Sequence, residues 1–405
     1  MIHLISNRYS RPVTACPLWL RVMWRELRAI AASYSVVLVL VGGVFAYGVL
    51  YNYMYAPNVV REVPLVVVDH SQSALSRRYA SLLDATPEVA VAYHAADMPE
   101  AKRLLAAGEA YGILYLPADF ERSVFEGRSA TLPLYAVTDA FLYYESVERA
   151  NMLVLEALDA EYRTALAPYL SPQGLVAAAT QSPVEVVGTA LYNPIEGYGV
   201  YLIPSVLMII IFQTLMMLVA MRAGSDRQHG ALTPYVRMRG GRTSVALSLV
   251  CGKSFAYALL YAIFAFFLVG FLPLIFNIPH GAPWGSLVAL LVPYILGTAF
   301  LGMALSRWYT DAEAPILLIA FFSIGLIFLS GVSYPFELMP WYWQAAHYIV
   351  PAAPAVMAYV QLGSMDATLH DVWPQLLALW VQMAVYFMLA VLCYRGKLKG
   401  APSHL

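Results

Sequence analysis

The sequence predicts a mainly α-helical membrane protein, with six transmembrane helices and an inserted α/β external domain. Of its 405 residues, 60% are hydrophobic and only 12% are charged, and the mean hydropathy is +0.64. A soluble domain is about a quarter charged, so the surplus apolar surface is expected to face lipid. Six stretches without Asp, Glu, Lys or Arg reach the roughly 17 to 25 residues that cross a bilayer as a helix. One long polar segment separates the first stretch from the other five.

The predicted transmembrane helices are these six uncharged stretches. They cover residues 29–51, 198–221, 254–279, 284–306, 314–336 and 372–394. Prolines such as Pro204 and Pro293 are compatible with membrane helices, because neighbouring helices satisfy the freed backbone groups. The last five stretches form a predicted bundle over 198–394, followed by a tail at 395–405.

The distribution of Lys and Arg predicts that both termini are cytoplasmic. These residues gather before the first span, between spans two and three, and after span six, whereas 276–284 and 334–370 have none. Cytoplasmic loops are the ones enriched in Lys and Arg, so residues 52–197 are predicted to lie outside. That segment carries 18 acidic and 9 basic side chains, against 7 and 15 in the rest of the chain. The formal net charge of −1 excludes the basic balance of a nucleic-acid binder.

Residues 1–28 are predicted to be a cytoplasmic segment that contains an amphipathic helix. Between residues 17 and 30, apolar side chains alternate with arginines at helical spacing. This pattern is typical of a helix in the membrane interface, with Trp towards lipid and Arg towards water. A simple extension of the first span fits the periodicity about equally well. The apolar run 29–51 is long and starts late for a cleaved signal peptide, so we interpret it as an uncleaved signal-anchor.

The segment 52–197 predicts a small α/β domain, because short β-branched strands alternate with helices. The predicted strands are 63–68, 89–93, 110–116 and 132–137, and the predicted helices are 73–84, 98–107, 119–125 and 142–167. Asp69, Asp119 and Asp139 stand at or beside strand ends, where the ligand sites of α/β domains often lie. We favour the interpretation that they cap helices or turns.

Motifs for hydrolytic or metal chemistry are absent from the sequence, which contains no HExxH, CxxC or GxSxG. Gly252-Lys253-Ser254 resembles the end of a phosphate-binding loop. However, Leu247 stands where that loop needs its first glycine, and no strand is predicted before it. The chain is therefore not expected to be an enzyme, or to bind ATP, a metal or another cofactor.

Four local motifs accompany the order of one span, an external domain and five spans. The first joins Asp69-His70-Ser71-Gln72-Ser73 and Ser76 with the later Pro117-Ala118-Asp119-Phe120. The second is Leu191-Tyr192-Asn193-Pro194 before span two, with Pro204 inside it. The third is Asp226-Arg227-Gln228-His229-Gly230-Ala231, followed by Gly252-Lys253. The fourth, after span five, comprises Ser330-Gly331, Tyr334-Pro335, Met339-Pro340 and Pro351.

With these motifs, nearly the whole chain resembles the permease, or transmembrane, subunit of type-2 ABC exporters. It departs from the family pattern at Gln228, where Glu is usual, and at Ala231, where Thr is usual. The resemblance implies a dimer with a second copy or a sister permease, served by two separate ABC ATPase subunits that bind ATP and Mg. A periplasmic adaptor stays open as a further partner, and membrane lipid surrounds the spans.

The resemblance also implies that loop 223–243 is a coupling helix seated in the ATPase. The residues expected to make this contact are Asp226, Arg227, Gln228, His229 and Gly230. Without the resemblance, an ordinary positive-inside loop would be the more plausible interpretation.

The segment 334–370 carries only Glu337 and Asp366 as charges and is broken by prolines, with several aromatic residues between them. This composition predicts re-entrant or interfacial helices. The resemblance implies that they roof the exit of the pathway. An aromatic anchor in the interface is a compatible interpretation.

Ionisable residues are absent from the centres of the predicted spans, which argues against a proton-coupled transporter. It favours an apolar or amphipathic substrate, drug- or lipid-like. The candidate pathway residues are Tyr201, Phe212, Gln213 and Met216 of span two, with Phe322, Ser323 and Phe328 of span five. Packing or lipid contact is the commoner role for such residues.

The leading hypothesis is therefore the permease subunit of an ATP-driven exporter in the bacterial inner membrane. The alternative is a non-transporting membrane anchor whose external domain binds an envelope partner. A membrane-embedded enzyme ranks last, because no polar constellation lies in the predicted spans.

Overall fold

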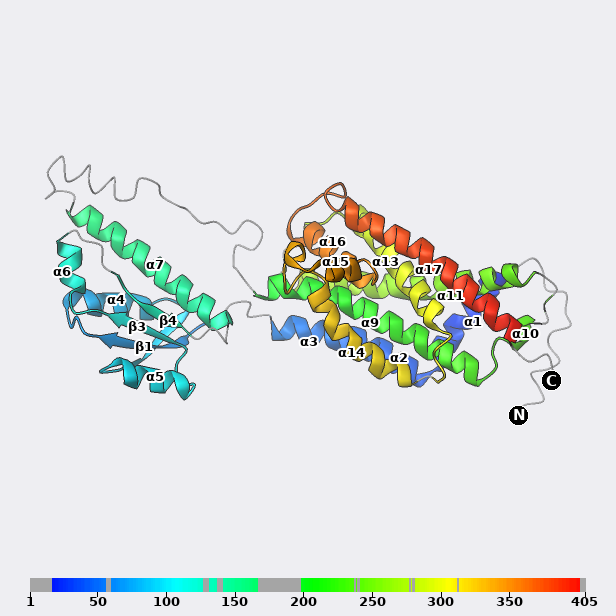
Figure 1. Cartoon of the computed structure of the whole chain (residues 1–405), viewed down its shortest axis with the longest axis horizontal. Helices are drawn as coiled ribbons and strands as arrows, with labels where there is room; N and C mark the ends of the chain where they lie inside the picture. Colours follow the sequence, from blue (N-terminus) through cyan, green and yellow to red (C-terminus); the bar gives the residue numbers. More distant parts are fainter. Residues whose placement is uncertain are drawn as a thin grey trace. The chain divides into compact units, whose positions relative to one another are not determined.

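The computed structural model is mostly helical, and the chain forms two compact units (Figure 1). It describes residues 17–55, 60–126, 131–136, 141–166, 198–236, 238, 241–276, 278, 281–311 and 313–400. One unit is continuous in sequence, Pro57–Tyr198, and the other combines the chain on both sides of it.

The continuous unit is built on a four-stranded sheet. Its strands are β1 (Val63–Asp69), β2 (Val89–His94), β3 (Gly112–Leu116) and β4 (Leu134–Ala136), in the order β2-β1-β3-β4. β1 runs parallel to both neighbours, whereas β4 pairs antiparallel with β3. The four predicted strands are thus confirmed, and the apolar run of β1 suits a central strand covered on both faces.

Helices cover both faces of this sheet (Figure 1). α4 (Ala74–Asp84) and α7 (Phe141–Leu166) pack on one face, where α4 contributes Tyr79 and α7 contributes Val147 to the core. α5 (Met98–Ala106) covers the other face through Ala101. α6 (Phe120–Phe125) follows β3 and buries Phe120 beside α4. Each layer buries an apolar stripe that its element could not bury alone.

The predicted capping role of Asp69 is confirmed. Its Oδ1 accepts hydrogen bonds from the backbone N–H groups of Ser71 and Gln72, each at 2.9 Å, and its Oδ2 accepts from the Ser76 hydroxyl at 2.7 Å. Ser73 and Ser76 complete a capping box at the start of α4. Asp119 precedes α6 without a side-chain capping bond, and Asp139 lies outside the described residues.

The second unit contains, among the described residues, five helical segments long and apolar enough to cross a membrane. They are Tyr34–Met54, formed by α2 (Tyr34–Val41), π-helix η1 (Gly42–Ala46) and α3 (Tyr47–Met54); α9 (Tyr198–Gln228); α11 (Arg242–Ala265) with π-helix η3 (Phe266–Phe271) and α12 (Leu272–Ile275); α13 (Trp284–Leu305); and α17 (Trp373–Gly400).

The predicted span 314–336 forms a shorter helix, α14 (Ala314–Leu329), of 16 residues. Such a helix is about 24 Å long, less than the roughly 30 Å of a hydrocarbon core. Five spans are therefore supported, and the sixth stays a prediction.

The helices that contain the second and third predicted spans extend beyond them, because both helices continue through charged residues. α9 runs on to Gln228 and α11 begins at Arg242, twelve residues before the predicted start. The predicted loop 223–243 thus contains the end of α9, the short helix α10 (Thr233–Val236) and the start of α11. Ion pairs compensate the buried charges of Arg222, Asp226 and Lys253, and the remaining charges are exposed, so neither kind ends the helices.

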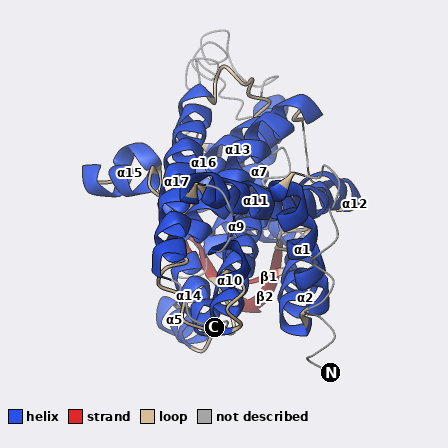
Figure 2. Cartoon of the chain, turned by 90° about the vertical axis from the view of Figure 1, so that its right-hand side faces the viewer, coloured by secondary structure: helices blue, strands red, loops and turns tan. Residues whose placement is uncertain are grey.

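The segment after α14 forms short helices separated by prolines. They are the 3-10 helix η4 (Phe336–Leu338), α15 (Trp341–His347) and α16 (Ala352–Ser364). α16 is buried against α13 and α17, whereas α15 lies at the edge of the helical bundle with Trp341 exposed (Figure 2). His347 connects α15 to the end of α14, because its Nδ1 lies 2.9 Å from the Leu329 carbonyl oxygen. The depth of these helices in a membrane stays a prediction.

Before the first span lies a separate helix, α1 (Leu18–Ala32). Ser33 has extended backbone angles and divides α1 from α2, so α1 is not a simple extension of the first span. α1 packs closely on α11 at Gly252. A Cβ atom at this position would lie 2.6 Å from the Val22 Cβ and even closer to the Trp19 carbonyl oxygen. The glycine of the Gly-Lys motif therefore permits helix contact.

We expect Gly252→Ala to lower the unfolding temperature of the purified protein. The added methyl group meets backbone rather than a movable side-chain tip, and overpacking of this kind costs about 1–3 kcal/mol. Gly396→Ala in α17 is the matched control, because a Cβ there meets no atom within 4 Å. Equal unfolding temperatures for the two variants would contradict the close packing of α1 on α11.

Candidate functional site

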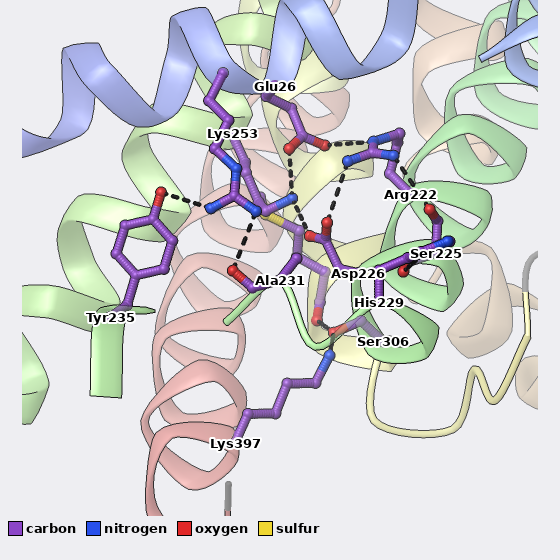
Figure 3. Close-up of polar contacts among 12 residues, drawn as sticks. Glu26, Arg222, Ser225, Asp226, His229, Ala231, Tyr235, Lys253, Ser306 and Lys397 are labelled. Carbon is purple, nitrogen blue, oxygen red and sulfur yellow. Dashed lines mark hydrogen bonds and ion pairs between the residues drawn. The ribbon is translucent and has the colours of Figure 1, made fainter. Parts of the chain in front are cut away.

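Four buried charged side chains join three helices of the second unit (Figure 3). Lys253 of α11 places its Nζ 2.7 Å from Glu26 Oε2 of α1 and 2.7 Å from Asp226 Oδ2 of α9. Arg222 of α9 lies opposite, with Nε 3.1 Å from Glu26 Oε1 and Nη2 3.1 Å from Asp226 Oδ1. The Tyr257 hydroxyl donates a further hydrogen bond to Glu26 Oε1 at 2.7 Å. We call Glu26, Arg222, Asp226 and Lys253 the charge cluster.

Opposite charges balance within the charge cluster. Its two acids and two bases are each less than a tenth exposed, so an unpaired charge here would carry a large desolvation cost. Burial alone would raise the pKa of the Glu26 carboxyl. The positive charges of Lys253 and Arg222, with hydrogen bonds from Lys253 and Tyr257, instead lower that pKa to about 2. Glu26 is therefore ionised at neutral pH and holds both bases in place.

Arg25 makes a second connection from α1, adjacent to Glu26 in the chain. Its Nη2 donates to the Ala231 carbonyl oxygen at 3.1 Å, and its Nη1 donates to the Tyr235 hydroxyl at 2.9 Å. The guanidinium carbon also lies 5.4 Å from the centroid of the Tyr235 ring. α1 thus contacts both the turn after α9 and helix α10.

The residues predicted to contact an ATPase divide into two groups. Arg227, Gln228, His229 and Gly230 are exposed at the end of α9 and in the turn that follows. Asp226 is instead buried, with both carboxylate oxygens bound in the charge cluster. Direct contact with a partner stays a prediction for the four exposed residues.

Local contacts give the exposed turn a defined shape. Arg227 Nη1 donates to the Arg307 carbonyl oxygen at 3.3 Å, which ties the turn to the connection between α13 and α14. His229 Nδ1 lies 2.9 Å from the Ser225 carbonyl oxygen. Gly230 has φ +60, a left-handed conformation that favours glycine at the end of a helix.

A cavity of about 730 Å³ lies between α9, α13, α14 and the segment after α14. Five of the seven predicted pathway residues line it, namely Phe212, Met216, Phe322, Ser323 and Phe328. Tyr201 and Gln213 do not line it. Tyr201 donates a hydrogen bond to the Val332 carbonyl oxygen instead. Apolar and aromatic side chains dominate the lining, and no charged residue belongs to it among the residues the structure describes.

The sequence indicates only part of the charge cluster. Asp226 belongs to the predicted ATPase contact and Lys253 to a family motif, whereas no motif marks Glu26 or Arg222. One signal is present, because Val22, Glu26 and Ile30 recur every four residues on the buried face of α1. An acid on the buried face of an amphipathic helix requires a basic partner.

Within the described part of the chain, no group of three or more His, Cys, Asp or Glu side chains lies together in a metal-binding arrangement.

Several apolar helices of membrane-crossing length define the chain as a membrane-spanning protein, and the charge cluster and a large apolar cavity lie among these helices. Residues 34–392 match the family described as ABC-2 family transporter protein. The chain belongs to this family, whose permeases are not themselves catalytic and normally work with an ABC ATPase. No curated protein matches the chain in sequence comparison.

Glu26→Gln is expected to destabilise the protein by about 3 kcal/mol at neutral pH, because two buried bases then share a single acid. Thermal unfolding of the purified chain measures this loss. Glu337→Gln is the matched control, since Glu337 is an exposed acid of η4.

Comparison of the wild type with Glu26→Gln at several pH values also tests the low pKa of Glu26. The pKa of Glu26 is lower in the folded protein than its ordinary value of 4.5, so the ionised carboxylate stabilises the fold fully above pH 4.5. This stabilisation is lost as the pH falls towards about 2. The difference in unfolding temperature between wild type and Glu26→Gln should therefore narrow from pH 5 to pH 3. A difference that is constant over this range would show that Glu26 is not ionised in the charge cluster.

Proposed function

We propose that this chain is the transmembrane subunit of an ATP-driven exporter in the bacterial inner membrane, with both termini cytoplasmic. It works as a dimer with a second copy or a sister permease. The observation that carries the proposal is the connection between the exposed turn at 227–230 and the helices behind it. The charge cluster and Arg25 connect this turn to α1, α9 and α11. A rigid attachment of this kind is what a docking segment for an ATPase requires.

Helix α9 provides the path from the docking turn to the cavity. It is continuous over 31 residues, with Asp226 near one end and the cavity residues Phe212 and Met216 further along. From Asp226 to Phe212 the helix rises about 21 Å. A displacement of the turn would therefore tilt α9 and change the width of the cavity. Coupling then requires each state of the ATPase to favour one state of the cavity.

The lining of the cavity supports an apolar or amphipathic substrate, drug- or lipid-like. Its volume lies within the roughly 300–1,000 Å³ range of small-molecule sites. The Ser323 hydroxyl already donates to the Ala320 carbonyl oxygen at 2.7 Å, so it has no proton left to offer a ligand. A charged group in this cavity would lack a partner and carry a large desolvation cost.

The coupling proposal is tested with the chain and its cognate ABC ATPase reconstituted together in nanodiscs. Arg227→Ala removes the contact with the α13–α14 connection, and Gly230→Pro alters the left-handed turn. We expect both variants to assemble with the ATPase and to lower ATP turnover about fivefold or more, the lower end of typical coupling energies. Arg395→Ala, an exposed arginine on α17, should leave turnover unchanged. Failure of the wild-type chain to bind the ATPase, or unchanged turnover in both variants, would refute the proposal.

The cavity is tested separately by filling it. Gly325 lies in its lining, and a Cβ there meets no atom within 4 Å, so Gly325→Phe should occupy the cavity without disturbing the fold. We expect the affinity for the uncharged dye Nile red to fall about tenfold, which is roughly 1.4 kcal/mol of binding free energy, while the unfolding temperature is maintained. Gly285→Phe on α13 is the control, because this glycine is also open but lies outside the lining. Equal dye binding by the two variants would exclude the cavity as the apolar site.

A further inference from the structure

Helix α1 has three distinct sectors around its axis. The first is the buried stripe of Val22, Glu26 and Ile30, which packs on the rest of the unit. The second is apolar and wholly or partly exposed, and it contains Met23, Trp24 and Leu27. The third is basic and comprises Arg21, Arg25 and Arg28. Residues at these spacings share faces of a helix with 3.6 residues per turn, so Trp24 lies on the border between the apolar and basic sectors.

Contacts of Trp19 place α1 beside surface that faces lipid. Its ring lies 5.4 Å from the ring of Phe255, measured between centroids. Phe255 begins an exposed apolar stripe along α11 and η3 that continues through Leu259, Ile263 and Phe266. An apolar stripe of this length on a membrane-crossing helix is a lipid-contact surface. α1 therefore lies at its border, where its apolar sector reaches the hydrocarbon boundary.

The exposed charged side chains of α1 are all basic. Glu26 is the only acid of the helix, and it is buried and paired in the charge cluster. Arg25 is engaged by Ala231 and Tyr235. Arg21 and Arg28 are exposed and make no hydrogen bond or ion pair with residues that the structure describes. They are seven residues apart, about 10 Å along the helix, a separation that suits two neighbouring lipid headgroups.

We propose that Arg21 and Arg28, with Trp24 beside them, form a binding site for anionic phospholipid headgroups. Guanidinium groups bind phosphate oxygens through paired hydrogen bonds, and an anionic leaflet attracts basic side chains near its surface. Tryptophan prefers the headgroup level of a bilayer. The basic sector adjoins the apolar one, so it lies at the membrane surface, which favours lipid over a soluble ATPase as its occupant.

Lipid bound at this site would also affect α9 and the turn that follows it. Glu26 and Arg25, which hold α9 and the turn after it, belong to the same helix as Arg21 and Arg28. Headgroups bound on the outer face of α1 would thus fix the helix against which the turn at 227–230 is supported. The lipid site does not depend on the exporter proposal.

Native mass spectrometry of the detergent-purified full chain tests the site, with titration of phosphatidylglycerol or phosphatidylcholine. The test variant is Arg21→Gln with Arg28→Gln. The control is Lys102→Gln with Arg103→Gln, which removes the same charge from two exposed residues of α5. We expect the wild type and the control to bind phosphatidylglycerol at least tenfold more tightly than phosphatidylcholine. The test variant should lose most of this preference, at roughly fivefold per arginine near an anionic surface.

Two results would overturn the site. One is equal affinity of the wild type for the two lipids. The other is a test variant that retains its preference for phosphatidylglycerol. If this second result came with loss of a co-purifying ATPase, the basic sector would be a protein-docking surface instead. Neither lipid titration requires an ATPase, so the outcome is independent of whether the chain is an exporter subunit.

Discussion

The arrangement of the membrane unit depends on the mutual neutralisation of four buried charges. Glu26, Arg222, Asp226 and Lys253 come from three helices, and each contacts two charges of opposite sign. None of them could remain buried alone, because an isolated ion in this environment carries a penalty of several kcal/mol. Burial of one therefore requires all three helices to be in register. Such clusters contribute little net stability relative to apolar packing, and their effect is to define which arrangement of α1, α9 and α11 is allowed.

This constraint attaches α1 to its neighbours at three places. α1 is attached to α11 by close packing at Gly252, to α9 by the charge cluster, and to the turn after α9 by Arg25. Under the proposed function, a force applied by an ATPase to the exposed turn would be shared between α9 and α1. The displacement would then be transmitted along α9 to the cavity as movement of a rigid body. The last turns of α9 cannot separate from α1 and α11 without exposing the buried charges.

The sequence indicates the elements more completely than the site. The strands are recognisable because β-branched runs such as Val66–Val68 are bounded by turn residues, and the spans because uncharged runs of sufficient length have few alternative structures. The charge cluster is a different case. A criterion that ends a membrane helix at the first charge places Lys253 outside α11 and Arg222 outside α9, although both lie within them. The contacts of Glu26 with Arg222 and Lys253 join residues more than 190 positions apart in the sequence. Periodicity therefore reveals that Glu26 is buried, but only the fold identifies its partners.

The two walls of the cavity differ in how firmly they are held, and this difference bears on how the cavity would open. α9 is buried over nearly its whole length. α14 buries only Pro315, Ile319, Ser323 and Leu326, a single stripe, and its remaining faces are exposed. A substrate that enters from the membrane would displace the loosely packed α14 at lower cost than α9, since fewer buried contacts are lost. Under the proposed function, a force from the turn at 227–230 acts on α9 instead. The cavity would then lie between a loosely held wall that responds to substrate and a firmly held wall that responds to the ATPase.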